Sequence, residues 1–248
     1  MSGHSKWHNI KLKKGKVDAQ RGALFTKLSK EIILAAKSGS PDPEANYRLK
    51  MAVEKARENN VPQENIKRAI GRAGGGADEK PIEELRYEGY GPAGVAVIVD
   101  AATDNRNRTA SELRFLFNRN DGTLGESGSV GWMFEPHGVV EVRPRGLSED
   151  ALTERALVDG VIDVRFDVDL TEIVTGPTAL MAVKDALEAA GLAVASARLT
   201  MDAKQMVHPG NADTAKVVTF LEALEEHEDV QSVFSNAEFD DAALEALT

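Results

Sequence analysis

The stretch Gly94-Val95-Ala96-Val97-Ile98-Val99-Asp100-Ala101 contains the longest apolar run in a chain of 248 residues. A short run rich in β-branched residues, bounded by turn residues, predicts a strand that is buried on both faces. The run is far too short to cross a bilayer, and the first residues carry no apolar segment of signal-peptide length. We therefore expect a cytoplasmic protein that makes no membrane contact.

Three amphipathic helices are predicted before this strand. The first has its apolar stripe from Leu24 onward and ends at residues 38–41, where the sequence reads Ser-Gly-Ser-Pro. Asp42 as N-cap and Pro43 as first helical residue predict the start of the second helix. The third follows Pro62, because proline and the preceding pair of asparagines interrupt the helical pattern.

After a glycine linker at residues 74–76, strands alternate with helices. The prediction comprises strands at 94–101, 130–134, 139–142, 162–170, 192–199 and 230–234, a turn at 136–138, a helix opened by a capping box of Thr109 and Glu112, a helix capped by Ser148, a helix ending at Gly191 and a helix around 217–224. This pattern predicts the α+β class, with an N-terminal three-helix domain carrying a basic arm and then two small α+β sandwich-type domains. The expected domains are 1–78, then 79–135 completed by 208–248, and 136–207 as an insertion.

The charge of the chain is divided unevenly along its length. The formal net charge is −10, yet residues 1–80 hold 17 Lys/Arg against 9 Asp/Glu, and residues 81–248 hold 13 against 31. Within residues 1–37 there are 9 basic and 2 acidic side chains. This asymmetry indicates a basic N-terminal region that binds polyanions, joined to an acidic body that repels them.

Residues 1–20 form the strongest functional feature of the sequence. They contain five lysines and a tryptophan but too few apolar residues to bury, which is typical of an arm that orders on a partner. Lysines can follow phosphates, and an aromatic ring can stack on an exposed base. A solvated tail is the alternative. The residues predicted to contact nucleic acid here and on the helices are His4, Lys6, Trp7, His8, Lys11, Lys13, Lys14, Lys16, Arg21, Lys27, Lys67 and Arg68.

A second candidate site is the polar segment 103–109, which follows the buried strand and opens a helix. Backbone N–H groups at a helix start, together with guanidinium groups, can hold an anion. Asn105, Arg106 and Arg108 are therefore candidate contacts for an anion or RNA. Asparagine and aspartate are also common turn and cap residues, so a purely structural turn is the equal alternative.

The sequence argues against catalysis. With no cysteine, disulfides, thiolate metal sites and cysteine nucleophiles are excluded. His4 and His8 have no third ligand nearby, so neither a metal nor another cofactor is expected. A nuclease or hydrolase centred on Asp104 would need a metal or nucleophile that the pattern does not supply. A pure protein-interaction module is a further alternative, and it predicts that deleting residues 1–20 leaves function intact.

Several strings together resemble the YebC/PmpR family, and the resemblance covers nearly the whole chain. They are Gly3-His4-Ser5-Lys6-Trp7 with Lys14, Lys16, Asp18, Arg21 and Phe25-Thr26-Lys27; Asn60-Val61-Pro62 with Asn65-Ile66; Tyr87-Glu88-Gly89-Tyr90-Gly91-Pro92; Thr103-Asp104-Asn105-Arg106-Asn107-Arg108-Thr109; and Gly128-Ser129-Val130. The resemblance implies three domains, an α-helical one followed by two α+β domains, and a role in gene expression.

The resemblance implies that role in two forms. Bacterial members are described as DNA-binding transcriptional regulators, whereas the mitochondrial relative is a translational activator and other members are linked to easing ribosomes through proline runs. From the residues, we expect a non-enzymatic nucleic-acid-binding regulator. A thin arm suits folded RNA, which favours a ribosome-associated, rRNA-binding translation factor that eases elongation at proline-rich stretches. A DNA-binding transcriptional regulator is the alternative, and a homodimer is left open.

Overall fold

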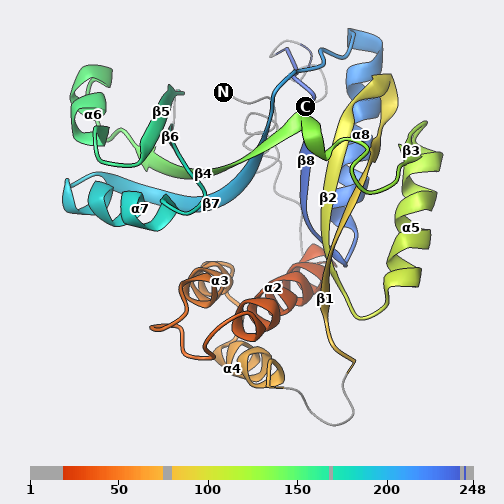
Figure 1. Cartoon of the computed structure of the whole chain (residues 1–248), viewed down its shortest axis with the longest axis horizontal. Helices are drawn as coiled ribbons and strands as arrows, with labels where there is room; N and C mark the ends of the chain where they lie inside the picture. Colours follow the sequence, from red (N-terminus) through yellow and green to blue (C-terminus); the bar gives the residue numbers. More distant parts are fainter. Residues whose placement is uncertain (1–18, 75–79, 168–169, 241–242, 244–248) are drawn as a thin grey trace. The chain divides into compact units, whose positions relative to one another are not determined.

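The structure is a computed structural model that describes residues 19–74, 80–167, 170–240 and 243. The chain divides into two compact units (Figure 1). The larger unit ends its first segment at Gly131 and resumes at Val207, and the smaller unit runs from Trp132 to Met206. Each unit contains one four-stranded sheet.

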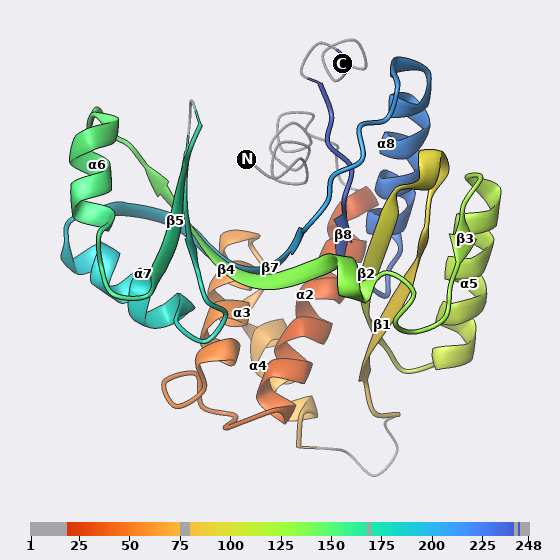
Figure 2. The same ribbon diagram turned by 45° about the horizontal axis from the view of Figure 1, so that its top comes forward.

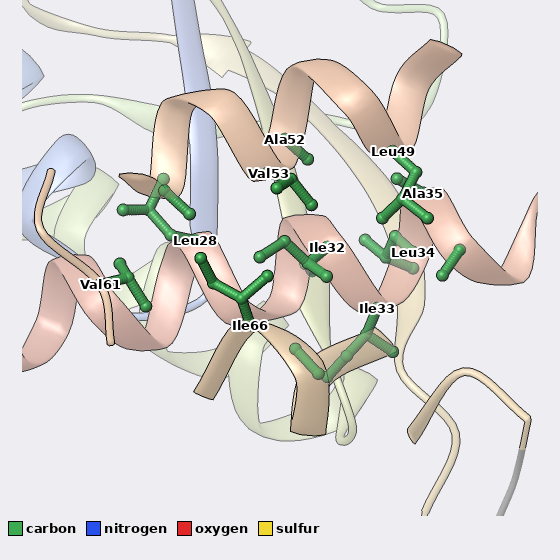
Figure 3. Packing of buried hydrophobic residues seen from close by; sticks show 14 of the residues in the cluster. Leu28, Ile32, Ile33, Leu34, Ala35, Leu49, Ala52, Val53, Val61 and Ile66 are labelled. Atoms are coloured by element: carbon green, nitrogen blue, oxygen red, sulfur yellow. The ribbon is translucent and has the colours of Figure 1, made fainter. Parts of the chain in front are cut away.

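Three helices open the larger unit: α2 (Ala19–Lys37), α3 (Tyr47–Glu58) and α4 (Gln63–Arg72). Their apolar stripes meet in one core, where Ile32 of α2, Leu49 of α3 and Ile66 of α4 are at most 1% exposed (Figure 3). Burying a side chain of this size contributes about 1.5–3 kcal/mol relative to leaving it in water. The predicted three-helix domain is therefore confirmed.

The second helix starts later than the sequence predicts, because Asn46 caps it. The Asn46 side chain accepts a hydrogen bond from the N–H of Leu49 at 3.1 Å, and its amide donates to the carbonyls of Ala35 and Ser40 at 2.8 and 2.7 Å. The predicted N-cap, Asp42, lies in an exposed turn before the helix. The prediction was wrong because a buried amide with three partners stabilises this start more than the local Asp-Pro pair does.

An antiparallel sheet of order β3-β1-β2-β8 forms the second part of the larger unit. Phe117 and Phe220, from the two helices of this part, are fully buried and meet edge to face with ring centroids 4.9 Å apart. The central strand β2 contains the apolar run and is almost wholly buried, as predicted. The elements are β1 (Glu83–Tyr90), β2 (Ala96–Thr103), α5 (Arg106–Arg119), β3 (Thr123–Leu124), α8 (Asn211–Glu226) and β8 (Val230–Ser235).

Two features of this sheet differ from the prediction. Strand β1 was not predicted, because its charged residues obscure the alternation that identifies a strand. The capping box at Thr109 and Glu112 is also wrong. Helix α5 starts earlier, with Asn105 as N-cap accepting a hydrogen bond from the N–H of Arg108 at 3.2 Å. Thr109 is instead fully buried within the helix.

The smaller unit is an antiparallel sheet of order β5-β6-β4-β7 with two helices on one side (Figure 2). Its core joins Val140 and Ile173 of the sheet to Leu152 and Leu187 of the helices, all at most 1% exposed. Ser148 caps the first of these helices, as predicted. The elements are β4 (Phe134–Arg143), α6 (Glu149–Ala156), β5 (Val161–Phe166), β6 (Thr171–Thr175), α7 (Leu180–Ala189) and β7 (Ala193–Ala203).

Three predictions in or next to this unit were wrong. In place of the strand expected at 130–134 there is a short 3-10 helix, Gly131–Met133, and β4 begins only at Phe134. The expected turn at 136–138 is the interior of β4, which pairs with β7 from Phe134 onward but with β6 only from Gly138. Pro136 is tolerated because β4 has no neighbour on its β6 side at that position. The expected strand at 162–170 ends at Phe166, and the chain returns as β6, which the sequence analysis missed.

The α+β class with an N-terminal helical domain and two sheet domains is confirmed. Strand β8 pairs with β2, so the C-terminal segment returns to the first sheet. This pairing supports the discontinuous second domain, while the boundaries at 78, 135 and 207 stay a prediction. No helix in the part of the chain that the structure describes combines the length and apolar character needed to cross a membrane.

Candidate nucleic-acid interface

Most residues predicted to contact nucleic acid lie outside the described part of the chain, and their role stays a prediction. The side chain of Arg21, at the start of α2, is also outside the described part. The site is therefore built from the helical domain and the elements that pack beside it in the larger unit. The predicted contacts outside the described residues are His4, Lys6, Trp7, His8, Lys11, Lys13, Lys14 and Lys16.

A groove of about 580 Å³ opens beside α2 and α4. Five cationic and two acidic side chains line it, and one further carboxylate, that of Asp229, pairs with two of the cations. Cations remain in excess, so the groove attracts anions. Phe25 and Ile33 add apolar surface. The charged lining residues are Lys30, Arg68, Arg72, Lys80 and Arg108, with Asp104 and Glu228.

Asp229 fixes two of the groove's cations in place. Its fully buried carboxylate accepts hydrogen bonds from Lys30 of α2, from Arg108 Nη2 at 2.9 Å and from Thr109 Oγ1 at 2.7 Å. Burial alone would raise the pKa of Asp229, but the donors and the charge of Lys30 outweigh it and hold the pKa far below its usual range. The ionised carboxylate ties α2 to α5 and to the start of β8.

Lys27, a predicted nucleic-acid contact, has an internal partner. Its Nζ donates a hydrogen bond to the carbonyl of Glu225, in the last turn of α8. A cation there compensates carbonyls that have no partner within the helix. A contact between Lys27 and nucleic acid stays a prediction, and it would compete with this bond.

Helix α4 presents the other two predicted contacts of the helical domain. Lys67 and Arg68 are both exposed, and Lys67 Nζ lies 3.5 Å from Glu64 Oε1 one turn earlier. Surface pairs of this kind are worth about 0–1 kcal/mol, so Lys67 can leave Glu64 for a phosphate at little cost. Arg68 lines the groove. Arg72 and Lys80 line it too, although neither was among the residues predicted to contact nucleic acid.

The segment 103–109 serves mainly to hold the structure together. Asn105 caps α5, and Arg108 contacts Asp229 and also Asp104, 3.3 Å away. Hydrogen bonding to Asp229 raises the pKa of Arg108 further. Arg106 is exposed, and its carbonyl accepts a hydrogen bond from the Tyr87 hydroxyl at 3.4 Å. Anion binding by Asn105, Arg106 and Arg108 stays a prediction. The alternative, a purely structural turn, explains the contacts of Asn105 and Arg108.

Glu88 is a buried residue whose role the sequence analysis missed. Its carboxylate accepts hydrogen bonds from the N–H groups of Gly128 at 2.9 Å, Val130 at 2.8 Å and Gly131 at 2.6 Å. Burial favours the neutral form, but these three donors outweigh it and lower the pKa of Glu88. The glycine-rich loop at residues 122–131 thus binds a carboxylate of its own chain, and no local sequence pattern connects this loop with Glu88.

One cluster has the residue types of a metal site. Among the described residues, Glu112, His227 and Asp229 bring ligand atoms within 4.8 Å of one another. The N–H of Asp229 donates to His227 Nδ1 at 3.1 Å, which assigns the ring proton to Nε2, 3.0 Å from Glu112 Oε2. The carboxylate of Asp229 is already paired with Lys30 and Arg108. Because these cations repel a divalent ion, the cluster fits a hydrogen-bond network better than a metal centre.

The fold and site together define a class of α+β protein in which a three-helix domain with a cationic groove precedes two sheet domains. Two family models match this chain: the TACO1/YebC protein N-terminal domain over residues 5–76, and the TACO1/YebC second and third domain over residues 82–237. The chain therefore belongs to the TACO1/YebC family, which confirms the resemblance found in its motifs.

Proteins of similar length and sequence carry a regulatory name. One from Pelotomaculum thermopropionicum is 49% identical over 97% of this chain and 100% of its own, and one from Moorella thermoacetica is 49% identical over 100% and 99%. Each is named a probable transcriptional regulatory protein. The crystal structure of a conserved hypothetical protein from Aquifex aeolicus superposes with a TM-score of 0.82 at 46% identity, covering 91% of this chain and 93% of that one.

Proposed function

We propose that this chain is a non-enzymatic regulator of gene expression that binds DNA through its helical domain and acts on transcription. The observation that carries the proposal is the groove beside α2 and α4, whose lining holds more cations than carboxylates. Phosphate oxygens are the groups that such a surface fits, and phosphate contacts supply most nonspecific affinity for DNA. The names of the relatives support transcription as the process.

The chemistry beside the groove supports binding without catalysis. Asp104 pairs with Arg108 at 3.3 Å, and Asp229 is ionised and held by three donors. A general base must be able to take a proton at working pH, and a carboxylate with a strongly lowered pKa cannot do so. The described residues around the groove therefore suit recognition of an anion better than its hydrolysis.

A ribosome-associated translation factor is the competing function, and it was the one favoured by the sequence. Its basis is the lysine- and tryptophan-bearing segment at residues 1–18, which lies outside the described residues. The names of the relatives give this function no support. A homodimer stays a prediction under either function.

Crosslinking in cells, followed by sequencing of the attached nucleic acid, tests the proposal. We expect genomic DNA to be enriched over ribosomal RNA, and the enrichment to fall in Arg68→Glu but not in Arg114→Glu. Arg114 is the matched control because it is exposed on α5 and does not line the groove. Enrichment of ribosomal RNA would overturn the transcriptional role, and crosslinks to neither polymer would overturn nucleic-acid binding.

A further inference from the structure

Helices α3 and α4 are consecutive helices joined by a short turn, which is the connection found in a helix-turn-helix. Helix α3 ends at Glu58 and α4 begins at Gln63, which leaves a four-residue turn. Asn60 in this turn has φ 59°, in the left-handed region. A helix-turn-helix joins its helices through three or four residues, often including glycine, and asparagine is one of the few other residues that adopt this conformation readily.

The inner side of this motif is fixed by the core. The N–H of Val61 donates to the carbonyl of Ala56 at 2.9 Å, and the Val61 side chain is only 5% exposed. On α4, Ile66 and Ala69 are buried in the core shared with α2. Because its inner face is anchored in this way, α4 presents its outer face in one orientation.

The outer face of α4 is polar and cationic. An α-helix with its side chains is about 10–12 Å in diameter, which suits a DNA major groove about 12 Å wide, and the ten residues of α4 make it about 15 Å long. Cations outnumber acids on this face by three to one. The exposed residues of α4 are Gln63, Glu64, Lys67, Arg68, Gly71 and Arg72.

Gly71 leaves the last turn of α4 without a side chain on this face. Glycine is unfavourable inside a helix, so a helical glycine usually has a steric or conformational reason. Here the backbone is helical, and a Cβ added at Gly71 would meet no other atom within 4 Å. The outer face of α4 therefore has open space at Gly71, beside Lys67 and Arg68, into which a partner surface can approach the helix backbone.

We propose that α3 and α4 form a DNA-binding helix-turn-helix, with α4 as the recognition helix in the major groove of duplex DNA. This inference rests on the proposed function and specifies how the site works. Lys67 and Arg68 supply donors to base edges and phosphates, and Gly71 permits the close approach. Duplex RNA does not fit, because its major groove is too deep and narrow for side chains to read.

The test measures binding of the full chain to a mixed-sequence DNA duplex and to an RNA duplex of the same sequence and length. We expect wild type to prefer DNA, and Arg68→Ala to weaken DNA binding about tenfold. Gly71→Ala should weaken DNA binding several-fold while its melting temperature stays unchanged or rises by about 1–2 °C, because alanine favours the helix. This variant separates loss of binding from loss of folding. Arg114→Ala is the charge control and should bind like wild type.

The remaining outcomes separate this inference from the proposed function. If Arg68→Ala weakens DNA binding but Gly71→Ala binds DNA like wild type, the close approach of a recognition helix is overturned and the proposed function stands. Equal or tighter binding to duplex RNA also overturns the major-groove assignment. If the chain binds neither duplex, the proposed function fails, and this inference fails with it.

Discussion

Replacing Asp229 with asparagine tests the anchor beneath the groove. The substitution preserves the shape of the side chain but removes the charge that Lys30 and Arg108 share. The buried carboxylate connects α2 with α5 and with the start of β8, so its loss should loosen the helical domain from the sheet. We therefore expect a stability loss that is large for a change of one atom.

The exposure of the two cations sets the size of this loss. Removing one partner of a fully buried ion pair costs about 3–5 kcal/mol, because the remaining charge is left without compensation. The Lys30 side chain is 14% exposed, and Arg108 is 37% exposed with Asp104 as a second partner. Since both cations keep some access to water, we expect Asp229→Asn to lower the free energy of unfolding by about 2–3 kcal/mol.

Urea unfolding followed by circular dichroism measures the loss, with Asp100→Asn as the matched control. Asp100 pairs with Arg86 at 2.7 Å, but both side chains are about one-third or more exposed, so the control should lose at most about 1 kcal/mol. Hydrogen exchange should locate the loosening in α2 and β8. Equal losses for the two variants would refute the anchoring role of Asp229.

The pH dependence gives the same prediction a second readout. The folded-state pKa of Asp229 lies below its unfolded-state value. The contribution of ionised Asp229 to the free energy of unfolding is therefore complete above the unfolded-state pKa of about 3.9. It is lost as the pH falls toward the folded-state pKa. The stability difference between wild type and Asp229→Asn should shrink below about pH 4. A difference that stays constant on acidification would contradict the lowered pKa.

Three further substitutions test other parts of the structure. Glu88→Gln removes the charge that holds the glycine-rich loop, so it should cost about 1–3 kcal/mol and speed hydrogen exchange at Gly128 and Gly131; unchanged exchange would contradict this. Gly89→Ala places a Cβ 2.5 Å from the Thr123 carbonyl, so it should lower the free energy of unfolding by at least about 2 kcal/mol, and its melting temperature should fall. An unchanged melting temperature would contradict the close packing. Ile173→Ala empties a fully buried position in the smaller unit and should cost about 2–5 kcal/mol in urea unfolding; a loss typical of a surface site would place Ile173 outside the core.

Elements with a strong local signal could be predicted from the sequence. The apolar run in β2 and the stripes of the three N-terminal helices gave the right elements, because the side chains that define the period are the ones that become buried. Where tertiary contacts decide, prediction failed. Asn46 starts α3 because it reaches the carbonyls of Ala35 and Ser40. Pro136 lies inside β4, where it pairs with β7, because the pairing of β4 with β6 begins only two residues later.

The candidate site could be predicted only as a list of cations. Charge asymmetry identified Lys67 and Arg68, but no local pattern distinguishes an available lysine from Lys27 or Lys30, whose partners lie about two hundred residues away. Glu88 was missed for the same reason, since the loop that binds it follows some forty residues later. Such long-range pairs depend on the fold and leave no periodic signal.

The dependence of DNA affinity on salt tests the electrostatic claim most directly. If about five phosphates of a DNA duplex are neutralised, the logarithm of the association constant should fall linearly with the logarithm of salt concentration, with a slope of about −4.5. Arg68→Ala should make this slope shallower by about 1. An affinity that does not change with salt would contradict phosphate recognition by the cationic groove.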